Sequence, residues 1–164
     1  MAKRDEYYLR VAKAVGSDST CTRRKFGAVI VVNDAIVTTG YNGPVRGGVN
    51  CNEVGCAKDV LDLPPYRGYE ACPAVHAEEN AVINAGASGG KGIFGGNLYI
   101  YGEDPQGEPV PSHPCDRCKR VLINARIEEV ITMDTEGRII TYEVRDWIKE
   151  DTNNYMELLE NKKI

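Results

Sequence analysis

The chain has 164 residues with 42% hydrophobic content, which is enough to bury one sizeable core, so residues 1–164 are expected to form a single domain. Its formal net charge of −4 argues against DNA or another long nucleic acid as the main partner, because such binding needs many cationic contacts to phosphates. A small, singly phosphorylated ligand is compatible with this charge, since it needs only a local cluster of donors.

The N-terminal residues and the six cysteines bear on the cellular compartment. The first residues, MAKRDE, lead into a charged amphipathic stretch with no apolar run long enough for a signal peptide or a transmembrane helix. A cytoplasmic protein without membrane contact is therefore expected. In a reducing cytosol, metal binding is a more common use of cysteine than disulfide bonding.

The first predicted elements are a helix and a β-hairpin. Apolar residues recur at helical spacing over residues 5–17, which predicts an amphipathic helix. Residues 26–32 and 35–41 are rich in β-branched side chains, and Asn33-Asp34 between them is a short turn pair. This arrangement predicts two antiparallel strands.

The rest of the chain is predicted to alternate between helices and strands after an irregular stretch. Residues 42–73 are rich in Gly, Pro and Cys, with only residues 57–63 indicating a helical turn. So long an irregular stretch is usually functional or held by something other than a core. The alternation that follows predicts an α/β sandwich. Its elements are a helix at 76–86, a strand at 97–101, a helix at 115–125, a strand at 129–133 and a helical tail over 141–159, whose Trp147 is expected to pack inward.

Two short motifs together predict a zinc site. His76-Ala77-Glu78 lies mid-chain, and Pro114-Cys115-Asp116-Arg117-Cys118 follows it. Two thiolates offset the charge of Zn²⁺, one neutral imidazole completes three protein ligands, and a fourth position stays open for water, as in catalytic sites. Cys115 and Cys118 are three residues apart, so both thiols are expected on one face of a first helical turn, where the helix dipole favours thiolates. The combination of motifs matches the zinc deaminase signature.

A purely structural zinc site, or a pair of reduced cysteines, is the alternative interpretation of the same residues. Structural sites usually have four protein ligands, and Cys72 could supply the fourth to His76, Cys115 and Cys118. Helical spacing alone would pair His76 with Glu79 or Asn80, so the role of Glu78 comes from the signature and not from helix geometry.

The sequence resembles the deoxycytidylate deaminases of the cytidine deaminase superfamily. The resemblance covers about residues 5–135 and rests on the two zinc motifs, together with RKFGAVI at 24–30, GYNG at 40–43 and GGVNC at 47–51. It implies a three-layer α/β/α sandwich with a mixed five-stranded sheet. It also implies Zn²⁺ held by His76, Cys115 and Cys118, with Glu78 as the proton shuttle for hydrolysis of dCMP to dUMP and ammonia. The segment 102–113 is longer than the usual link, and it could be a lid or a partner contact.

The other four cysteines suggest a second zinc. Some viral members of the family resembled carry a structural zinc whose cysteine ligands match Cys21 and Cys51, with further ligands shortly before the His-Ala-Glu motif. Cys72 fits that last place, and Cys56 is inferred as the remaining ligand. Such a site would stabilise the irregular stretch directly. Buried, unpaired cysteines are the alternative.

The expected substrate contacts are Arg24, Asn42 and Ala77. Residues 23–25 form the only dense basic cluster, and a guanidinium group binds phosphate through two hydrogen bonds. A solvated run of charge is the alternative explanation for such a cluster. Asn42 resembles the family residue that binds the sugar. His113 is expected to be a partly exposed loop residue and not a ligand.

Two other functions remain open from the sequence. One is another deaminase of the superfamily, acting on cytidine, guanine or a tRNA adenosine; the other is a zinc-stabilised binding module without catalysis. The resemblance further suggests a homo-oligomer, often a hexamer, with dCTP and dTTP as effectors.

Overall fold

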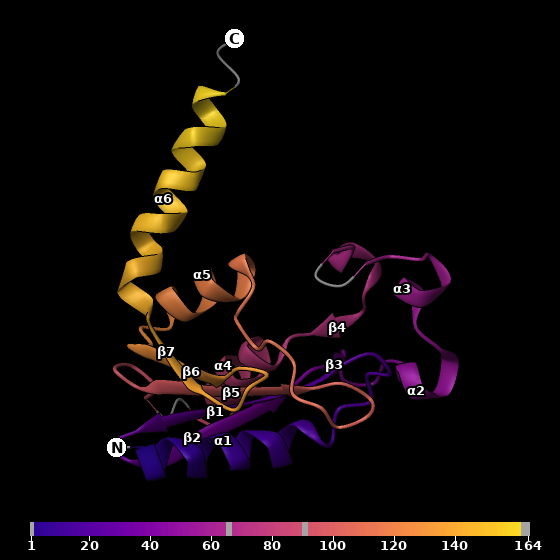
Figure 1. Cartoon of the computed structure of the whole chain (residues 1–164), viewed down its shortest axis with the longest axis horizontal. Coiled ribbons are helices and arrows are strands. Elements are labelled where there is room, and N and C mark those ends of the chain that lie inside the picture. The colour runs from indigo at the N-terminus through magenta and orange to yellow at the C-terminus, as the bar shows by residue number, and fades with distance from the viewer. Residues whose placement is uncertain (1, 65–66, 90–91, 162–164) are drawn as a thin grey trace.

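The computed structural model describes residues 2–64, 67–89 and 92–161, and its centre is a five-stranded mixed sheet with strand order β2-β1-β5-β6-β7 (Figure 1). Strand β1 pairs antiparallel with both β2 and β5, β5 pairs parallel with β6, and β6 pairs antiparallel with β7. The sheet strands are β1 (Lys25–Val32), β2 (Ala35–Tyr41), β5 (Asn97–Glu103), β6 (Glu129–Met133) and β7 (Ile139–Glu143), and a separate two-stranded sheet joins β3 (Gly43–Pro44) to β4 (Ala74–Val75).

Helices cover both faces of the main sheet, which confirms the predicted three-layer sandwich. Helix α1 (Ala2–Gly16) packs on one face, against side chains such as Val29 and Tyr99. Helices α4 (Ala77–Ala87), α5 (Asp116–Asn124) and the first turns of α6 (Val144–Glu160) cover the other, against Ile30 and Leu98. Neighbouring strand residues point to opposite faces, so each strand supplies both apolar clusters.

The predicted hairpin is confirmed, but the predicted tail is partly wrong. Asn33 and Asp34 both adopt positive φ angles, of 47° and 62°, as a two-residue hairpin turn requires. The tail, predicted to be helical from residue 141, begins instead with strand β7, and the helix starts at Val144. Residues 139–143 form a strand because they pair with the edge of β6, a contact that local sequence does not reveal. This pairing supplies the fifth strand of the sheet.

The irregular stretch contains more short elements than predicted. Helix α3 (Ala57–Val60) coincides with the expected turn, whereas α2 (Cys51–Val54) and the 3₁₀ turn η1 (Tyr69–Ala71) were not anticipated. The long segment 102–113 also has structure of its own. Strand β5 continues to Glu103, and the chain then folds back so that the Val110 amide donates to the Gly102 carbonyl at 3.0 Å. Val110 and Ser112 are buried.

Helix α4 is attached to β2 by hydrogen bonds along its length. The side-chain amides of Asn80 and Asn84 donate to the carbonyls of Tyr41 and Thr39, at 2.7 and 2.8 Å. The helix also comes close to the strand backbone at Gly40, where a side chain would collide with it. These contacts fix the start of α4, and therefore His76, relative to the sheet.

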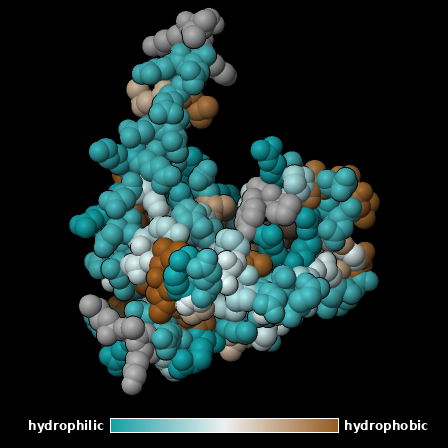
Figure 2. All heavy atoms as spheres, viewed as in Figure 1, coloured by the Kyte–Doolittle hydropathy of each residue, from teal (hydrophilic) through white to brown (hydrophobic). Residues whose placement is uncertain are grey.

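Helix α6 forms an arm that extends away from the sandwich (Figure 1). Its first turns are anchored by Val144 and Trp147, which are 3% and 5% exposed, so Trp147 packs inward as predicted. Beyond Asp151 the arm exposes apolar side chains among hydrophilic ones (Figure 2). Within the described residues, no helix has the length and apolar character needed to cross a membrane. The exposed apolar residues of the arm are Ile148, Tyr155, Met156, Leu158 and Leu159.

Candidate active site

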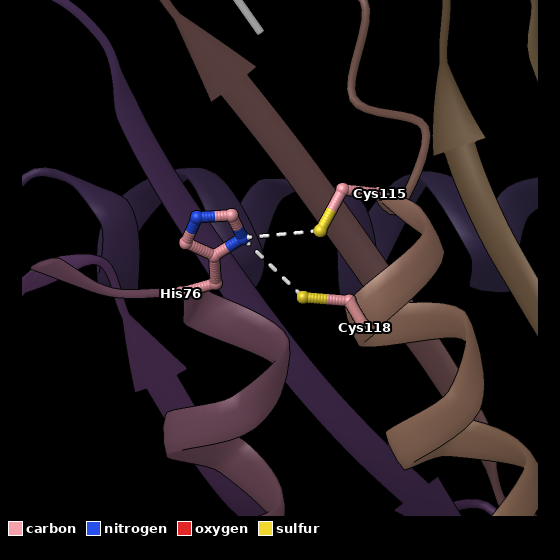
Figure 3. A group of neighbouring side chains, drawn as sticks. All are labelled: His76, Cys115 and Cys118. Atoms are coloured by element: carbon pink, nitrogen blue, oxygen red, sulfur yellow. Dashed lines mark hydrogen bonds between the residues drawn. The ribbon is translucent and has the colours of Figure 1, made fainter. Parts of the chain in front are cut away.

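The three predicted zinc ligands meet at the starts of two helices (Figure 3). His76 caps the N-terminus of α4, and Cys115 caps that of α5, with Cys118 one turn later. Both cap residues have an extended backbone, and Pro114 precedes Cys115. The starts of the two helices lie next to each other. The Nδ1 atom of His76 lies 3.6 Å from the Cys115 sulfur and 3.3 Å from the Cys118 sulfur. All three donor atoms lie within 4.8 Å of one another.

This geometry fits a tetrahedral zinc ion. With Zn–N near 2.0–2.1 Å and Zn–S near 2.3 Å, a tetrahedral angle puts nitrogen and sulfur about 3.6 Å apart. The two observed separations are close to that value. One imidazole and two sulfurs are also ligands that zinc prefers. Cys72 is not part of the group, so among the described residues the donor set has three members, as in catalytic sites.

The protonation of the two cysteines shows why this cluster suits a cation. Hydrogen bonds with Cys118, the larger cause, and with His76 together lower the pKa of Cys115 to about 3. The hydrogen bond with Cys115, together with burial, raises the pKa of Cys118 instead. The hydrogen bond to Cys115 raises the pKa of His76. The imidazole and the two thiols therefore share protons through hydrogen bonds. A zinc ion would displace these protons, since metal binding requires thiolates and neutral imidazole.

Glu78 lies in the first turn of α4, beside this cluster, and is only 5% exposed. Burial raises the pKa of its carboxyl group, because the charged form loses hydration. A carboxyl group whose protonated form is favoured near a metal site can both accept and deliver a proton. Its position agrees with the proton-carrying role that the signature indicates.

Glu79 has a positioning role that the motif analysis did not assign. Its carboxylate accepts a hydrogen bond from the His76 backbone amide at 3.2 Å and forms an ion pair with Arg117 at 2.9 Å. Because Arg117 belongs to α5, Glu79 links the two helices that carry the zinc ligands. Helical spacing did point to Glu79 as a neighbour of His76, but the bond is to the backbone and not to the imidazole.

One cavity of about 700 Å³ opens onto the cluster and contains the predicted substrate contacts. Arg24, Asn42 and Ala77 all line it, as do His76 and Glu78. The side-chain amide of Asn42 accepts a hydrogen bond from the Phe26 amide at 2.7 Å and donates one to the Arg24 carbonyl at 3.0 Å. An amide group can make four hydrogen bonds, so one donor and one acceptor site remain for a ligand.

The four remaining cysteines also line this cavity, at the side formed by α2, α3 and η1. Burial raises the pKa of Cys51, and the nearby thiols of Cys21, Cys56 and Cys72 raise it further. The four cysteines therefore lie near one another, and the structural zinc stays a prediction. However, no three of them come within 4.8 Å of one another in the part of the chain that the structure describes. None of the six cysteines forms a disulfide.

His113 lies outside the metal group, as predicted. It is exposed in the loop before α5, and its ring makes an edge contact with Tyr142, with centroids 4.7 Å apart. Through Tyr142 and Trp147 it packs at the base of the α6 arm.

Comparison with known proteins agrees with the fold and the metal site. Residues 2–134 match the family described as cytidine and deoxycytidylate deaminase zinc-binding region. The chain therefore belongs to this family of zinc-binding deaminases, and the matched region contains His76, Cys115 and Cys118. The family region ends before β7 and the α6 arm.

Individual relatives are named deoxycytidylate deaminase. Those from Schizosaccharomyces pombe and Saccharomyces cerevisiae are each 32% identical over 127 residues, covering 77% of this chain and 36% of the relative. This chain thus spans about a third of their length. The Mycobacterium phage D29 protein is 33% identical over 132 residues, covering 77% of this chain and 91% of the phage protein. The dCMP deaminase of cyanophage S-TIM5, solved in complex with dCMP and dUMP, shares the fold with a TM-score of 0.59 and 23% identity, covering 82% of this chain and 83% of that one.

Proposed function

We propose that this protein catalyses the hydrolytic deamination of dCMP to dUMP and ammonia, with Zn²⁺ as cofactor. The observation that carries the proposal is the His76, Cys115 and Cys118 group, with the buried Glu78 beside it, at the wall of one cavity. The names of the relatives support dCMP as the substrate.

In this proposal, residues of the chain bind the metal ion, contact the nucleobase and carry the proton. Zinc bound to the three donors would supply an ionised water molecule near neutral pH. Glu78 would accept a proton from the attacking water molecule and deliver it to the ring nitrogen beside the amino-bearing carbon of cytosine. It would then accept the proton of the newly added hydroxyl group and deliver it to the departing amino group, which leaves as ammonia. Glu79 and Arg117 keep α4 and α5 in register, so that His76 and the two cysteines retain their separations.

The substrate contacts follow from the residues that line the cavity. Asn42 would bind the sugar, because its amide is held rigidly by the backbone at Phe26 and Arg24 and keeps a free donor and acceptor site. Arg24 would bind the phosphate, and Ala77, at the start of α4, would contact the base.

A structural zinc ion on Cys21, Cys51, Cys56 and Cys72 is part of the same proposal. Two observations support this second site: all four cysteines line the same side of the cavity, and the other three thiols raise the pKa of Cys51. Because the sulfur atoms are too far apart to share one ion, the segments that contain them would have to move closer together when zinc binds. Purified protein should then contain two zinc ions per chain, and a Cys56→Ser variant should retain one. A single zinc in the unmodified protein would contradict this second site.

We further propose that the protein is a cytoplasmic homo-oligomer, of hexameric size, with dCTP and dTTP as effectors. The exposed apolar side chains of the α6 arm support self-association, because one helix with a bare apolar stripe is not a stable unit by itself. The effectors and the hexamer rest on the family resemblance.

The test of catalysis is a Glu78→Gln variant. The metal ligands are unchanged in this variant, so zinc content should equal that of the unmodified protein, while ammonia release from dCMP should disappear. Full activity of Glu78→Gln would refute the proton-carrying role. An unmodified protein that holds zinc but releases no ammonia would indicate the binding module instead.

The test of the substrate is a panel of cytosine, guanine and adenine nucleosides and nucleotides. If the phosphate is recognised, Arg24→Ala should lose activity on dCMP and leave activity on deoxycytidine nearly unchanged. Equal turnover of dCMP and deoxycytidine by the unmodified protein would favour another deaminase of the superfamily.

A further inference from the structure

Four cationic side chains line the cavity beside the metal group: Arg23, Arg24, Lys58 and Arg117. Three of them are already engaged. Arg23 forms an ion pair with Asp59 at 3.4 Å and donates to the Leu63 carbonyl at 3.0 Å, Arg117 pairs with Glu79, and Arg24 has a contact of its own. Lys58 differs from them, because its ammonium group has no ion-pair partner among the described residues.

Lys58 is buried, at 8% exposure, and has no ion-pair partner among the described residues. No carboxylate among the described residues lies within ion-pair distance of its ammonium group, which also donates no hydrogen bond to another described residue. The ammonium group instead lies over the Tyr69 ring, whose centroid is 5.2 Å from Nζ. Lysine is almost never buried unless it is paired, because removing the charge from water is costly. A ring face offsets only part of that cost.

The position of this ammonium group relates it to the metal cluster. The Tyr69 ring that contacts Lys58 also packs on the His76 ring, with centroids again 5.2 Å apart. The sum of these two distances is the largest possible separation, so Nζ lies no more than about 10.4 Å from the centre of the imidazole that would bind zinc. In a nucleoside monophosphate, one sugar ring separates the base from the phosphate. A phosphate on a base placed at the metal cluster would therefore lie at a distance comparable with this upper limit.

We propose that Lys58 is a second phosphate contact of the substrate site, in addition to Arg24, and that it strengthens the preference for pyrimidine nucleoside monophosphates over free nucleosides. This inference rests on the proposed deaminase function. The phosphate would supply the anion that the buried ammonium group lacks, in a charge-assisted hydrogen bond. Tyr69 would hold the lysine stem and the metal-binding imidazole at a fixed separation. Lys58 lies in the irregular stretch, where no motif pointed to it.

The proposal is tested by comparing two substrates that differ only in the phosphate. Ammonia release from dCMP and from deoxycytidine is measured for the unmodified protein, for Lys58→Gln and for Lys149→Gln, a control on the exposed side of the α6 arm. Lys58→Gln should lower kcat/KM for dCMP about 10- to 100-fold, the loss expected for a hydrogen bond to a charged group. The loss should appear mainly as a higher KM, because the hydrogen bond between Lys58 and the phosphate is the same in the bound substrate and in the transition state. Activity on deoxycytidine, and both activities of Lys149→Gln, should change less than about twofold.

Two readouts separate this role from a structural one. Calorimetric binding of dUMP and deoxyuridine should show the same selective loss in Lys58→Gln, and Lys58→Arg should recover part of the dUMP affinity. Equal losses for both ligands would overturn the assignment, as would loss of zinc from the variant, which would mean that Lys58 neutralises the cysteine cluster. If the unmodified protein deaminates neither substrate, the proposed function fails, and the calorimetric comparison still decides whether Lys58 binds phosphate.

Discussion

The close approach of α4 to the sheet at Gly40 predicts that a single methyl group there disturbs both stability and the metal site. A Cβ atom added at Gly40 would lie 2.3 Å from the Ala81 amide nitrogen and 2.5 Å from the Ala77 carbonyl oxygen. Both are backbone atoms, so no side chain can rotate away. To change the shorter contact from 2.3 Å to an ordinary 3.4 Å, α4 must move by about 1.1 Å relative to β2.

The magnitudes follow from that displacement. Overpacking costs about 1–3 kcal/mol, and the upper end applies because the obstacle is rigid backbone on a hydrogen-bonded helix. For a domain of this size, about 3 kcal/mol corresponds to a melting temperature lower by about 6–12 °C. Since α4 carries His76 and Glu78, an error of about 1 Å in their placement should lower kcat/KM for deamination on the order of 100-fold.

The assay compares Gly40→Ala with a matched control, Gly86→Ala. Gly86 lies in the same helix, and a Cβ atom there meets nothing within 4 Å. The control should gain up to about 1 kcal/mol and retain activity, because alanine is the better helix former. Thermal unfolding by circular dichroism, zinc content and ammonia release are measured for both variants. A Gly40→Ala variant with the melting temperature and activity of the unmodified protein would refute the role of this contact in placing the site.

Three further predictions address the ligands, the anchor of the arm and its tip. Cys118→Ser should purify with markedly less zinc by mass spectrometry, because only two of the three strong donors remain; full retention would contradict the ligand assignment. Trp147→Ala should cost about 3–5 kcal/mol and lower the melting temperature by about 6–20 °C, since it removes a large buried side chain, and a shift below 2 °C would show that the arm is not anchored there. Leu158→Glu should reduce the assembly size in gel filtration without lowering activity per folded chain, and unchanged elution at matched concentration would exclude the arm as a contact between copies.

Local sequence was a sufficient guide wherever one short segment contains the whole signal. The hairpin at Asn33-Asp34 needs only two β-branched runs and two residues that tolerate positive φ angles. The zinc ligands likewise lie at helix starts that the sequence predicts, because capping residues and the preceding proline act over a few residues. The ligand types then identify the metal by their own chemistry.

What required the tertiary structure are the features that depend on partners distant in the chain. Strand β7 exists because β6 offers it an edge, and without that edge its residues look like the start of the α6 helix. The sequence by itself determined the donor set and its cofactor, because ligand identity is a property of individual residues. Only the folded chain decided that Glu79 joins the two ligand helices and that Lys58 lies buried near the metal cluster, because burial and ion pairing depend on segments that meet in space.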